Sequence, residues 1–187
     1  MSYDLWYAIK VRPRSESMVA GSLSGKGYEL FLPTYRSKRS WSDRTKVLDL
    51  PLFAGYLFCR FDIQTRLPIL TTPGVGSIVG AGKTPEAVDE REIEAIRTVV
   101  GSGVVYEPYG HLPEGQLVHV EQGSLRGLTG VVMNHKKDSR LIISVTLLMR
   151  SVSVEIERSW LKPIGAPQGS FVFPDMISGH GLHGLHG

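Results

Sequence analysis

The chain has 187 residues, of which 42% are hydrophobic and 21% charged, and its formal net charge is +3 at pH 7. This composition is typical of a water-soluble globular protein, and the length suits two small domains. No apolar run approaches the roughly 20 residues that a membrane helix needs, so we expect no membrane association. Residues 1–14 do not have the charged and apolar segments of a secretory signal. The single cysteine, Cys59, excludes an internal disulfide and indicates a reducing, cytoplasmic environment.

The first hundred residues combine strand and helix patterns. A strand is predicted at residues 5–11, which are aromatic and β-branched, and a weak helix follows Ser15 and stops near Gly25. Strand composition returns at 28–35, where Pro33 indicates an edge or a bend. We then expect a basic hairpin loop at 36–46, a long central strand with a glycine kink at 47–61, and a short strand at 77–79.

A second helix is predicted near the end of this part. Asp89 is a good N-cap, and Glu92 follows three residues later, which is the spacing of a capping box. Apolar residues with helical spacing then continue up to Gly101: Ile93, Ile96, Val99 and Val100. The order of elements predicts an α+β domain over residues 1–104, with one antiparallel sheet and flanking helices.

The rest of the chain has a different character. Residues 105–115 are rich in turn-forming residues and are predicted to be a linker. Residues 116–164 show closely spaced strand patterns and no helix, which predicts a small all-β barrel. The glycine-rich segment 165–187 has no periodicity, so we expect a disordered tail.

Three glycines interrupt the start of the predicted barrel. Gly123 follows a strand at a hairpin, and Gly127 and Gly130 flank the next turn. Glycine tolerates the bends and positive φ angles that a small barrel needs in order to close. The pattern V-x-V, a spacer and these glycines resembles the KOW motif, which implies an SH3-like barrel. Ribosomal proteins carry this motif too.

A larger resemblance covers residues 5–164. The segments LWYAIKVRPRSE (5–16), FLP (31–33) and PLFAGYLFCRF (51–61) resemble the N-terminal (NGN) domain of the NusG family, and residues 137–164 resemble the second half of its KOW domain. The resemblance implies a transcription elongation factor that binds RNA polymerase. The run KVRPRSE and the long basic hairpin are most similar to the specialised paralogues of the RfaH and polysaccharide-locus antiterminator type.

In this family an apolar patch of the N-terminal domain binds the clamp helices of the largest polymerase subunit. The matching positions here are Trp6, Phe31, Leu32, Phe53, Tyr56 and Phe58. Large aromatic side chains carry much of the binding energy of protein interfaces. The same residues are equally compatible with a core role, because one face of each strand must be buried. Ala54 stands where the family usually has proline, although the aromatic positions are retained.

Basic residues near the first strand and in the hairpin are predicted to contact DNA. They are Lys10, Arg12, Arg14, Arg36, Lys38, Arg39, Arg44 and Lys46, with Trp41 among them. The resemblance implies upstream DNA or the displaced non-template strand as the partner, and Trp41 is suited to stack on an unpaired base. An ordinary solvated hairpin is the alternative. Factors of the RfaH type read a DNA element with an arginine before Gly-Val, but Pro73 stands there in this chain, so sequence-specific recruitment is not predicted.

The family's KOW domain binds a small-subunit ribosomal protein or Rho through an exposed apolar strip. The matching residues are Leu147, Leu148, Met149 and Arg150. In a small barrel such residues are also compatible with core and edge positions. Binding of a ribosomal protein would couple translation to transcription, whereas binding of Rho would make the chain a termination factor.

Catalytic and metal-binding patterns are not evident in the sequence. His180, His183 and His186 are three residues apart but separated by glycines, so ordering them around a metal ion would cost too much entropy. We therefore expect a monomeric binding protein without metal or cofactor, not an enzyme, that suppresses pausing and termination. Two alternatives are a housekeeping NusG that promotes Rho-dependent termination and a ribosome- or RNA-binding KOW protein.

Overall fold

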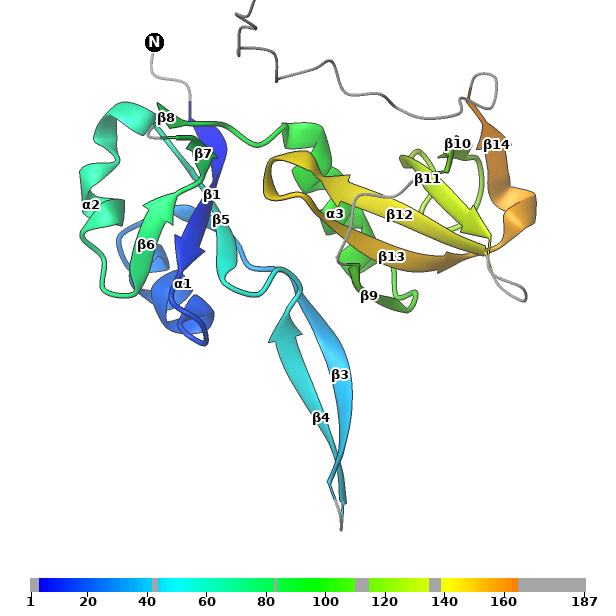
Figure 1. Cartoon of the computed structure of the whole chain (residues 1–187), viewed down its shortest axis with the longest axis horizontal. Helices are drawn as coiled ribbons and strands as arrows, with labels where there is room; N and C mark the ends of the chain where they lie inside the picture. Colours follow the sequence, from blue (N-terminus) through cyan, green and yellow to red (C-terminus); the bar gives the residue numbers. More distant parts are fainter. Residues whose placement is uncertain (1–3, 42–43, 83, 110–114, 135–138, 165–187) are drawn as a thin grey trace, which may run out of the picture.

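The computed structural model describes residues 4–41, 44–82, 84–109, 115–134 and 139–164. An N-terminal part with mixed strands and helices lies beside a strand-rich C-terminal part, and a two-stranded hairpin projects from the former (Figure 1). This arrangement confirms the predicted fold class. None of the helices in the described ranges is long and apolar enough to cross a membrane.

The N-terminal sheet has four antiparallel strands in the order β2-β5-β1-β6. They are β2 (Glu29–Phe31), β5 (Tyr56–Phe61), β1 (Leu5–Val11) and β6 (Val75–Ile78). The two central strands, β1 and β5, are apolar on both sides because helices cover both faces of the sheet. Helices α1 (Glu16–Ser24) and α2 (Leu67–Leu70) cover one face, and α3 (Glu90–Gly101) covers the other.

Local signals explain where two of the helices begin and end. Helix α1 stops before Gly25, as predicted, and buries Val19 and Leu23. Helix α3 begins after Asp89, whose side chain accepts a hydrogen bond from the Arg91 backbone N–H, so the predicted N-cap is confirmed. The four-residue helix α2 was not predicted, because it is too short to have a helical repeat.

The segment predicted as one long strand at 47–61 is divided between two sheets. Its first part belongs to β4 (Arg44–Pro51), which pairs only with β3 (Thr34–Trp41) in the projecting hairpin, and its second part is β5. Residues 36–46, predicted as a hairpin loop, are therefore mostly paired strand. The break lies at Gly55, whose φ of 84° is readily adopted only by glycine.

The C-terminal sheet has six strands in the order β14-β10-β11-β12-β13-β9. They are β9 (Tyr106–Tyr109), β10 (Gln116–Val120), β11 (Thr129–Asn134), β12 (Ser139–Val145), β13 (Arg150–Ile156) and β14 (Leu161–Pro163). Strand β9 occupies the start of the segment predicted as a linker. It pairs with β13, so the polypeptide enters the barrel sheet soon after α3 ends. The predicted tail, with its three histidines, lies outside the described residues.

The three glycines of the barrel serve two different purposes. Gly123 and Gly127 have φ angles of 78° and 92°, which favour glycine. A Cβ atom on Gly123 would lie 2.3 Å from the Trp160 ring, and one on Gly130 would lie 2.6 Å from the Ile142 carbonyl oxygen. Backbone conformation and close approach therefore both require glycine here, as the KOW-like spacing predicts.

Candidate functional site

Most of the aromatic residues singled out in the sequence lie on the side of the sheet that α3 covers. The strand register sets Phe58 opposite both Ala8 and Phe31, and directly opposed residues share a face. Phe53, in the loop before β5, contacts the Phe58 ring edge-on, with 5.7 Å between ring centroids. We call this group the aromatic face: Trp6, Phe31, Phe53, Tyr56 and Phe58. Leu32 is not part of it, because it packs in the cluster on the opposite side of the sheet.

The aromatic face is largely covered in this structure. Trp6, Phe53 and Phe58 are at most 2% exposed, whereas Phe31 and Tyr56 are half-buried. The Arg97 guanidinium of α3 lies 4.8 Å from the centroid of the Trp6 ring and 5.3 Å from that of Phe31. Such cation–π contacts favour a fixed position for the helix over the rings. These aromatic residues therefore form part of a packed core here, and their role in binding stays a prediction.

A buried carboxylate supports the loop that carries Phe53. Glu16, at the start of α1, is only 5% exposed, and its Oε1 accepts a hydrogen bond from the Gly55 backbone N–H at 2.8 Å. This bond joins α1 to the turn between β4 and β5. Glu16 is not recognisable as a buried residue from the sequence, because an acidic residue in the first turn of a helix is usually solvent-exposed and stabilises the helix dipole.

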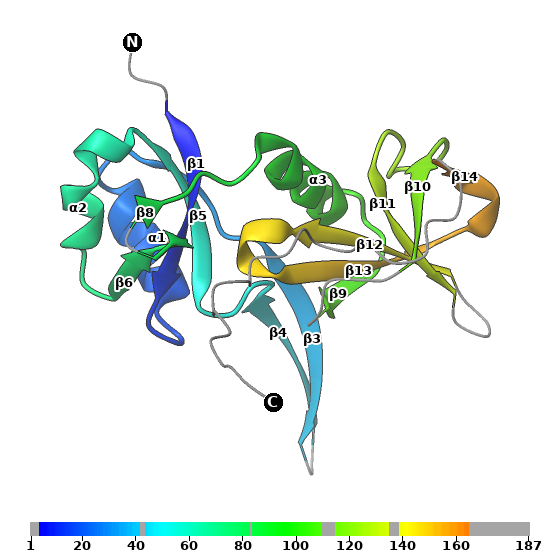
Figure 2. The ribbon, with the colours of Figure 1, turned by 45° about the horizontal axis from the view of Figure 1, so that its top comes forward.

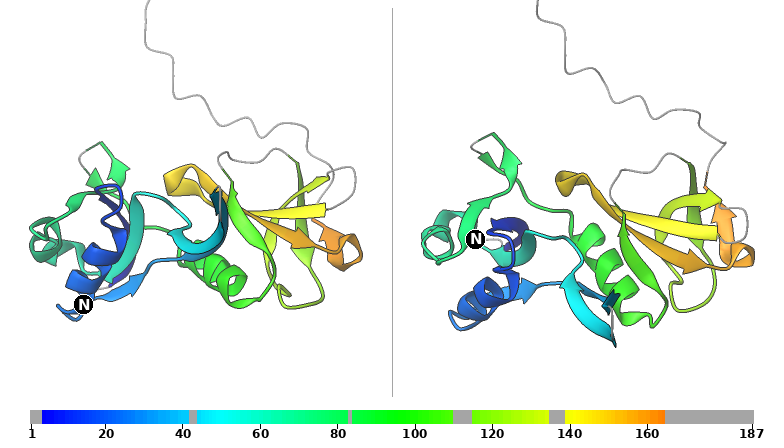
Figure 3. Two further views of the ribbon diagram at one scale, coloured as in Figure 1. Left: turned by 90° about the horizontal axis from the view of Figure 1, so that it is seen from below. Right: turned by 60° about the horizontal axis from the view of Figure 1, so that its bottom comes forward.

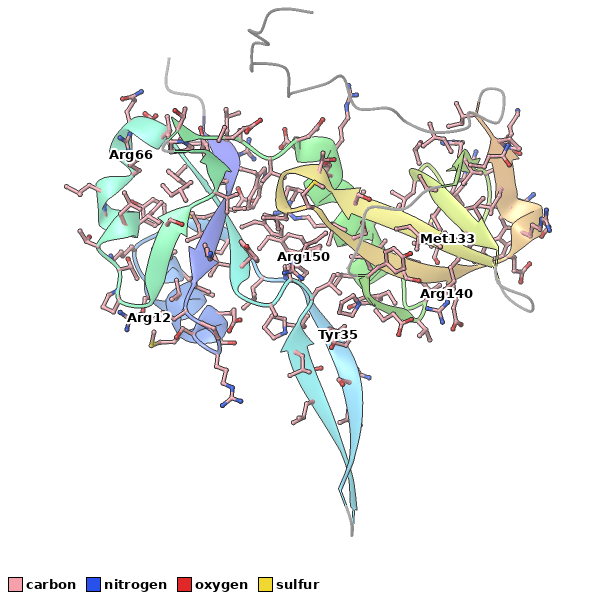
Figure 4. The ribbon with its side chains drawn as sticks, in the orientation of Figure 1. Arg12, Tyr35, Arg66, Met133, Arg140 and Arg150 are labelled. Atoms are coloured by element: carbon pink, nitrogen blue, oxygen red, sulfur yellow. The ribbon has the colours of Figure 1, made fainter. Side chains whose placement is uncertain are left out.

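The basic residues singled out in the sequence fall into two groups. Lys10, Arg12 and Arg14 are exposed at the end of β1, and Figure 4 shows Arg12 at the same lower end of the molecule from which the hairpin projects. The second group lies along the hairpin, where Arg36 is exposed and the register sets Arg39 opposite Lys46 and Trp41 opposite Arg44. The side chains of residues 38–46 lie outside the described part of the structure.

Arg14 has an unusual backbone conformation. The turn at residues 12–15 is closed by a hydrogen bond from the Ser15 N–H to the Arg12 carbonyl oxygen, at 3.0 Å. Within this turn Arg14 has a φ of 67°, which is uncommon for a residue other than glycine. Left-handed residues of this kind carry a conformational cost that is retained most often at functional sites.

The predicted apolar strip of the barrel lies in the connection between β12 and β13, which we call the barrel turn (residues 146–149). Leu148 is half-buried and packs against the cluster that contains the aromatic face, whereas Met149 is 58% exposed and has a φ of 51°. Arg150, which follows, is exposed at the end of the barrel that faces the N-terminal part (Figure 4). The side chain of Leu147 is outside the described residues.

In the described ranges, two hydrogen-bonded contacts join the barrel to the N-terminal part. Glu92 Oε1 on α3 accepts hydrogen bonds from the backbone N–H of Thr146, at 3.1 Å, and from its Oγ1, at 2.6 Å. The Tyr106 hydroxyl of β9 donates to the Thr34 carbonyl oxygen at the base of the hairpin, at 2.7 Å. Burial raises the pKa of Tyr106, so this hydroxyl stays a donor at neutral pH. Figure 2 and the right-hand view of Figure 3 show the barrel turn near α3.

Comparison with known proteins places this arrangement in a family. The model of the family described as transcription termination factor nusG matches residues 4–97. The chain belongs to the NusG family. Proteins named transcription termination/antitermination protein NusG from Campylobacter jejuni and Thermus thermophilus are 27% and 26% identical over 176 and 175 residues. These matches cover 88% and 82% of this chain and 99% and 95% of the relatives.

The fold comparison agrees with the family. The solved structure on domain interaction in Thermotoga maritima NusG has a TM-score of 0.52 and 18% identity, and covers 87% of this chain and 98% of that one. At this identity the likeness concerns the fold. It extends over both parts of this NusG-family chain, beyond the residues that the family model matches.

Neither a metal cluster nor a reactive thiol is found in the described part of this NusG-family chain. Within the described ranges, no cluster of three or more His, Cys, Asp or Glu residues is suited to hold a metal ion. Burial raises the pKa of the Cys59 thiol to about 12, so that the thiolate, which is the nucleophilic form, is not populated at neutral pH. The features that stand out are the aromatic face, the basic residues and the barrel turn.

Proposed function

We propose that this chain is a cytoplasmic transcription elongation and antitermination factor that binds RNA polymerase through its aromatic face. Membership of the NusG family supports this proposal, and the observation that carries it is the convergence of five aromatic residues on one side of the sheet. The proposed partner is the pair of clamp helices of the largest polymerase subunit. Helices offer ridges of side chains that a concave apolar surface can accept.

The proposed mechanism uses binding energy alone. A factor that contacts the clamp and the opposite side of the DNA cleft has a higher affinity for the closed polymerase than for the open, paused form. It therefore shifts the equilibrium toward the closed form by the difference between the two binding free energies. Pausing and termination are suppressed as a result.

The basic hairpin and the residues at the end of β1 are proposed to contact upstream DNA or the non-template strand. The hairpin projects from the body of the protein, which makes it accessible to a large partner (Figure 1). If about four phosphates are neutralised, the slope of log affinity against log salt concentration is about −3.6. Replacing both Lys38 and Arg39 by alanine is expected to flatten that slope by about 1.8, and an unchanged slope would remove the hairpin from the DNA.

The barrel turn is proposed to bind a second partner, either a small-subunit ribosomal protein or Rho. Its exposed Met149 is a flexible and polarisable side chain, which suits an apolar partner surface. The choice of partner determines the branch of the family.

The curated relatives named above match over nearly their full length, which favours a housekeeping NusG as the second candidate function. A termination assay with and without Rho separates the two, because the housekeeping factor increases Rho-dependent termination and the antiterminator decreases it.

The central test is binding of the full-length chain to RNA polymerase, with ribosomal particles as the competing target. Tyr56→Ala removes a half-buried tyrosine from the aromatic face. Tyr28→Ala is a matched control, because Tyr28 is also half-buried but packs on the opposite side of the sheet, against Phe61. We expect Tyr56→Ala to weaken polymerase binding about tenfold or more and Tyr28→Ala to leave it unchanged. Binding to ribosomal particles and not to polymerase would overturn the proposal in favour of a ribosome-binding KOW protein.

A further inference from the structure

The side chain of Glu92 has two possible partners that it cannot satisfy together. Glu92 is the third residue of α3, after the N-cap Asp89, and a glutamate at this position ordinarily reaches back to the backbone N–H of the N-cap residue. In this structure its Oε1 instead accepts both hydrogen bonds from Thr146 in the barrel turn. The Glu92 carboxylate, which could complete a capping box with Asp89, is therefore hydrogen-bonded to the barrel turn.

The other half of the capping box is in place. Asp89 has the extended backbone of an N-cap and accepts a hydrogen bond from the Arg91 N–H at 2.8 Å. The start of α3 is thus preformed, and rotation about the side-chain bonds of Glu92 is sufficient to bring its carboxylate to the Asp89 N–H. Both arrangements use charge-assisted hydrogen bonds, two from Thr146 in the docked form and one from the Asp89 N–H in the capped form, so capping recovers part of what undocking loses.

The hydrogen bonds between Glu92 and Thr146 help to position the rest of the barrel turn. Leu148, two residues further along the barrel turn, packs against the cluster that contains the aromatic face. Thr146 is exposed, and among the described residues its hydroxyl forms a hydrogen bond with Glu92 alone. Besides the apolar cluster that α3 shares with the barrel, the docked barrel is held at α3 by the Glu92 carboxylate and at the hairpin base by the Tyr106 hydroxyl.

We propose that Glu92 is a two-position switch that couples docking of the barrel to capping of α3. In the docked form it binds Thr146, and in the undocked form it caps its own helix through the Asp89 N–H. Because the cap replaces part of the hydrogen bonding lost at Thr146, undocking costs less than it would if Glu92 were left without a partner, although it still exposes apolar surface shared by α3 and the barrel. A partner of the barrel turn or of the aromatic face shifts the equilibrium by its difference in affinity for the two forms. The identity of those partners rests on the proposed function, whereas the switch itself does not.

The test uses the full-length chain without any partner and measures backbone amide hydrogen exchange at Thr146 and Asp89. Thr146→Val removes the hydroxyl donor with little change in shape and leaves Glu92 only the backbone N–H of residue 146 as a donor in the barrel turn, so the Asp89 N–H competes for the carboxylate more effectively. We expect about three- to tenfold faster exchange at residue 146 and, at the same time, slower exchange at Asp89. Glu92→Ala removes both possibilities, so exchange becomes faster at residue 146 and no slowing appears at Asp89. Glu90→Ala is the matched control, because it removes the same charge from the same helical turn and leaves both amides as in the wild type.

Separate tumbling of the two parts, measured by NMR relaxation, reports undocking independently of exchange. Both Thr146→Val and Glu92→Ala are expected to increase it relative to Glu90→Ala. Unchanged exchange at Asp89 in Thr146→Val would refute the two-position switch, and wild-type tumbling in Glu92→Ala would refute the role of Glu92 in docking. Polymerase binding is then measured for the same variants. If exchange and tumbling follow the expectation but polymerase does not bind, the proposed function is wrong and the switch stands.

Discussion

Replacing Arg14 by glycine separates the backbone strain at this position from its proposed contact with DNA. The residue is exposed in a tight turn with a φ of 67°. A left-handed conformation costs a residue with a side chain about 1–2 kcal/mol, and glycine adds about 0.5–1 kcal/mol of conformational entropy to the unfolded chain. The net expectation for Arg14→Gly is a gain in stability of about 0.5–1 kcal/mol. For a chain of this size the melting temperature then rises by about 1–4 °C.

The same substitution removes one positive charge from the proposed DNA surface. If Arg14 neutralises a phosphate, the slope of log affinity against log salt concentration moves toward zero by about 0.9. Arg14→Ala is the control, because it removes the same charge but keeps a side chain in the left-handed conformation. It is expected to change the slope equally without raising the melting temperature. A melting temperature for Arg14→Gly below that of the wild type refutes the strain argument, and an unchanged slope excludes Arg14 from the DNA contact.

Three further predictions concern stability and reactivity. Gly123→Ala is expected to destabilise the barrel by about 2–4 kcal/mol in chemical unfolding, because its methyl group would overlap the Trp160 ring; a cost below 1 kcal/mol contradicts this packing. Glu16→Ala leaves the partly buried Gly55 N–H without its acceptor, so we expect a loss of about 1–3 kcal/mol, measured by calorimetry against the wild type. The pKa of Cys59 is raised to about 12 by burial, so its contribution to stability is complete below pH 9 and is lost as the pH rises toward 12. At pH 8 the native thiol should resist alkylation and react only after unfolding, and rapid labelling of the folded chain would contradict its burial.

The elements that could be predicted from the sequence are those with a local repeat. Strand β1 and helix α3 were predicted close to their observed bounds, because alternation of apolar residues and helical spacing are properties of a short segment. The barrel followed from glycines whose conformations and close contacts allow few substitutes. The aromatic residues of the candidate site were also recognisable by type and spacing. In these cases the residues nearby in the sequence are sufficient to predict the local structure.

The division of residues 47–61 into two strands could not be predicted in the same way. Both halves are apolar, and the difference lies in their partners, since β4 pairs with β3 in the hairpin and β5 pairs with β1 and β2. Strand β9 is a similar case, because the sequence YEPY becomes a strand only by pairing with β13. Strand propensity depends strongly on the surface against which a segment packs.

The candidate site also combines features that are visible in the sequence with features that depend on tertiary contacts. The sequence by itself determined which residues were large and aromatic, which were basic, and where glycine was required, since these are properties of single residues and short spacings. Only the tertiary structure decided that Leu32 leaves the aromatic face, that Glu16 is buried under the Phe53 loop, and that Glu92 binds the barrel. The two hydrogen-bonded outcomes depend on partners far away in the chain, since Glu16 and Gly55 are 39 residues apart and Glu92 and Thr146 are 54 residues apart. Contacts of that kind leave no local repeat, because they arise from how the sheet, the helices and the barrel pack together.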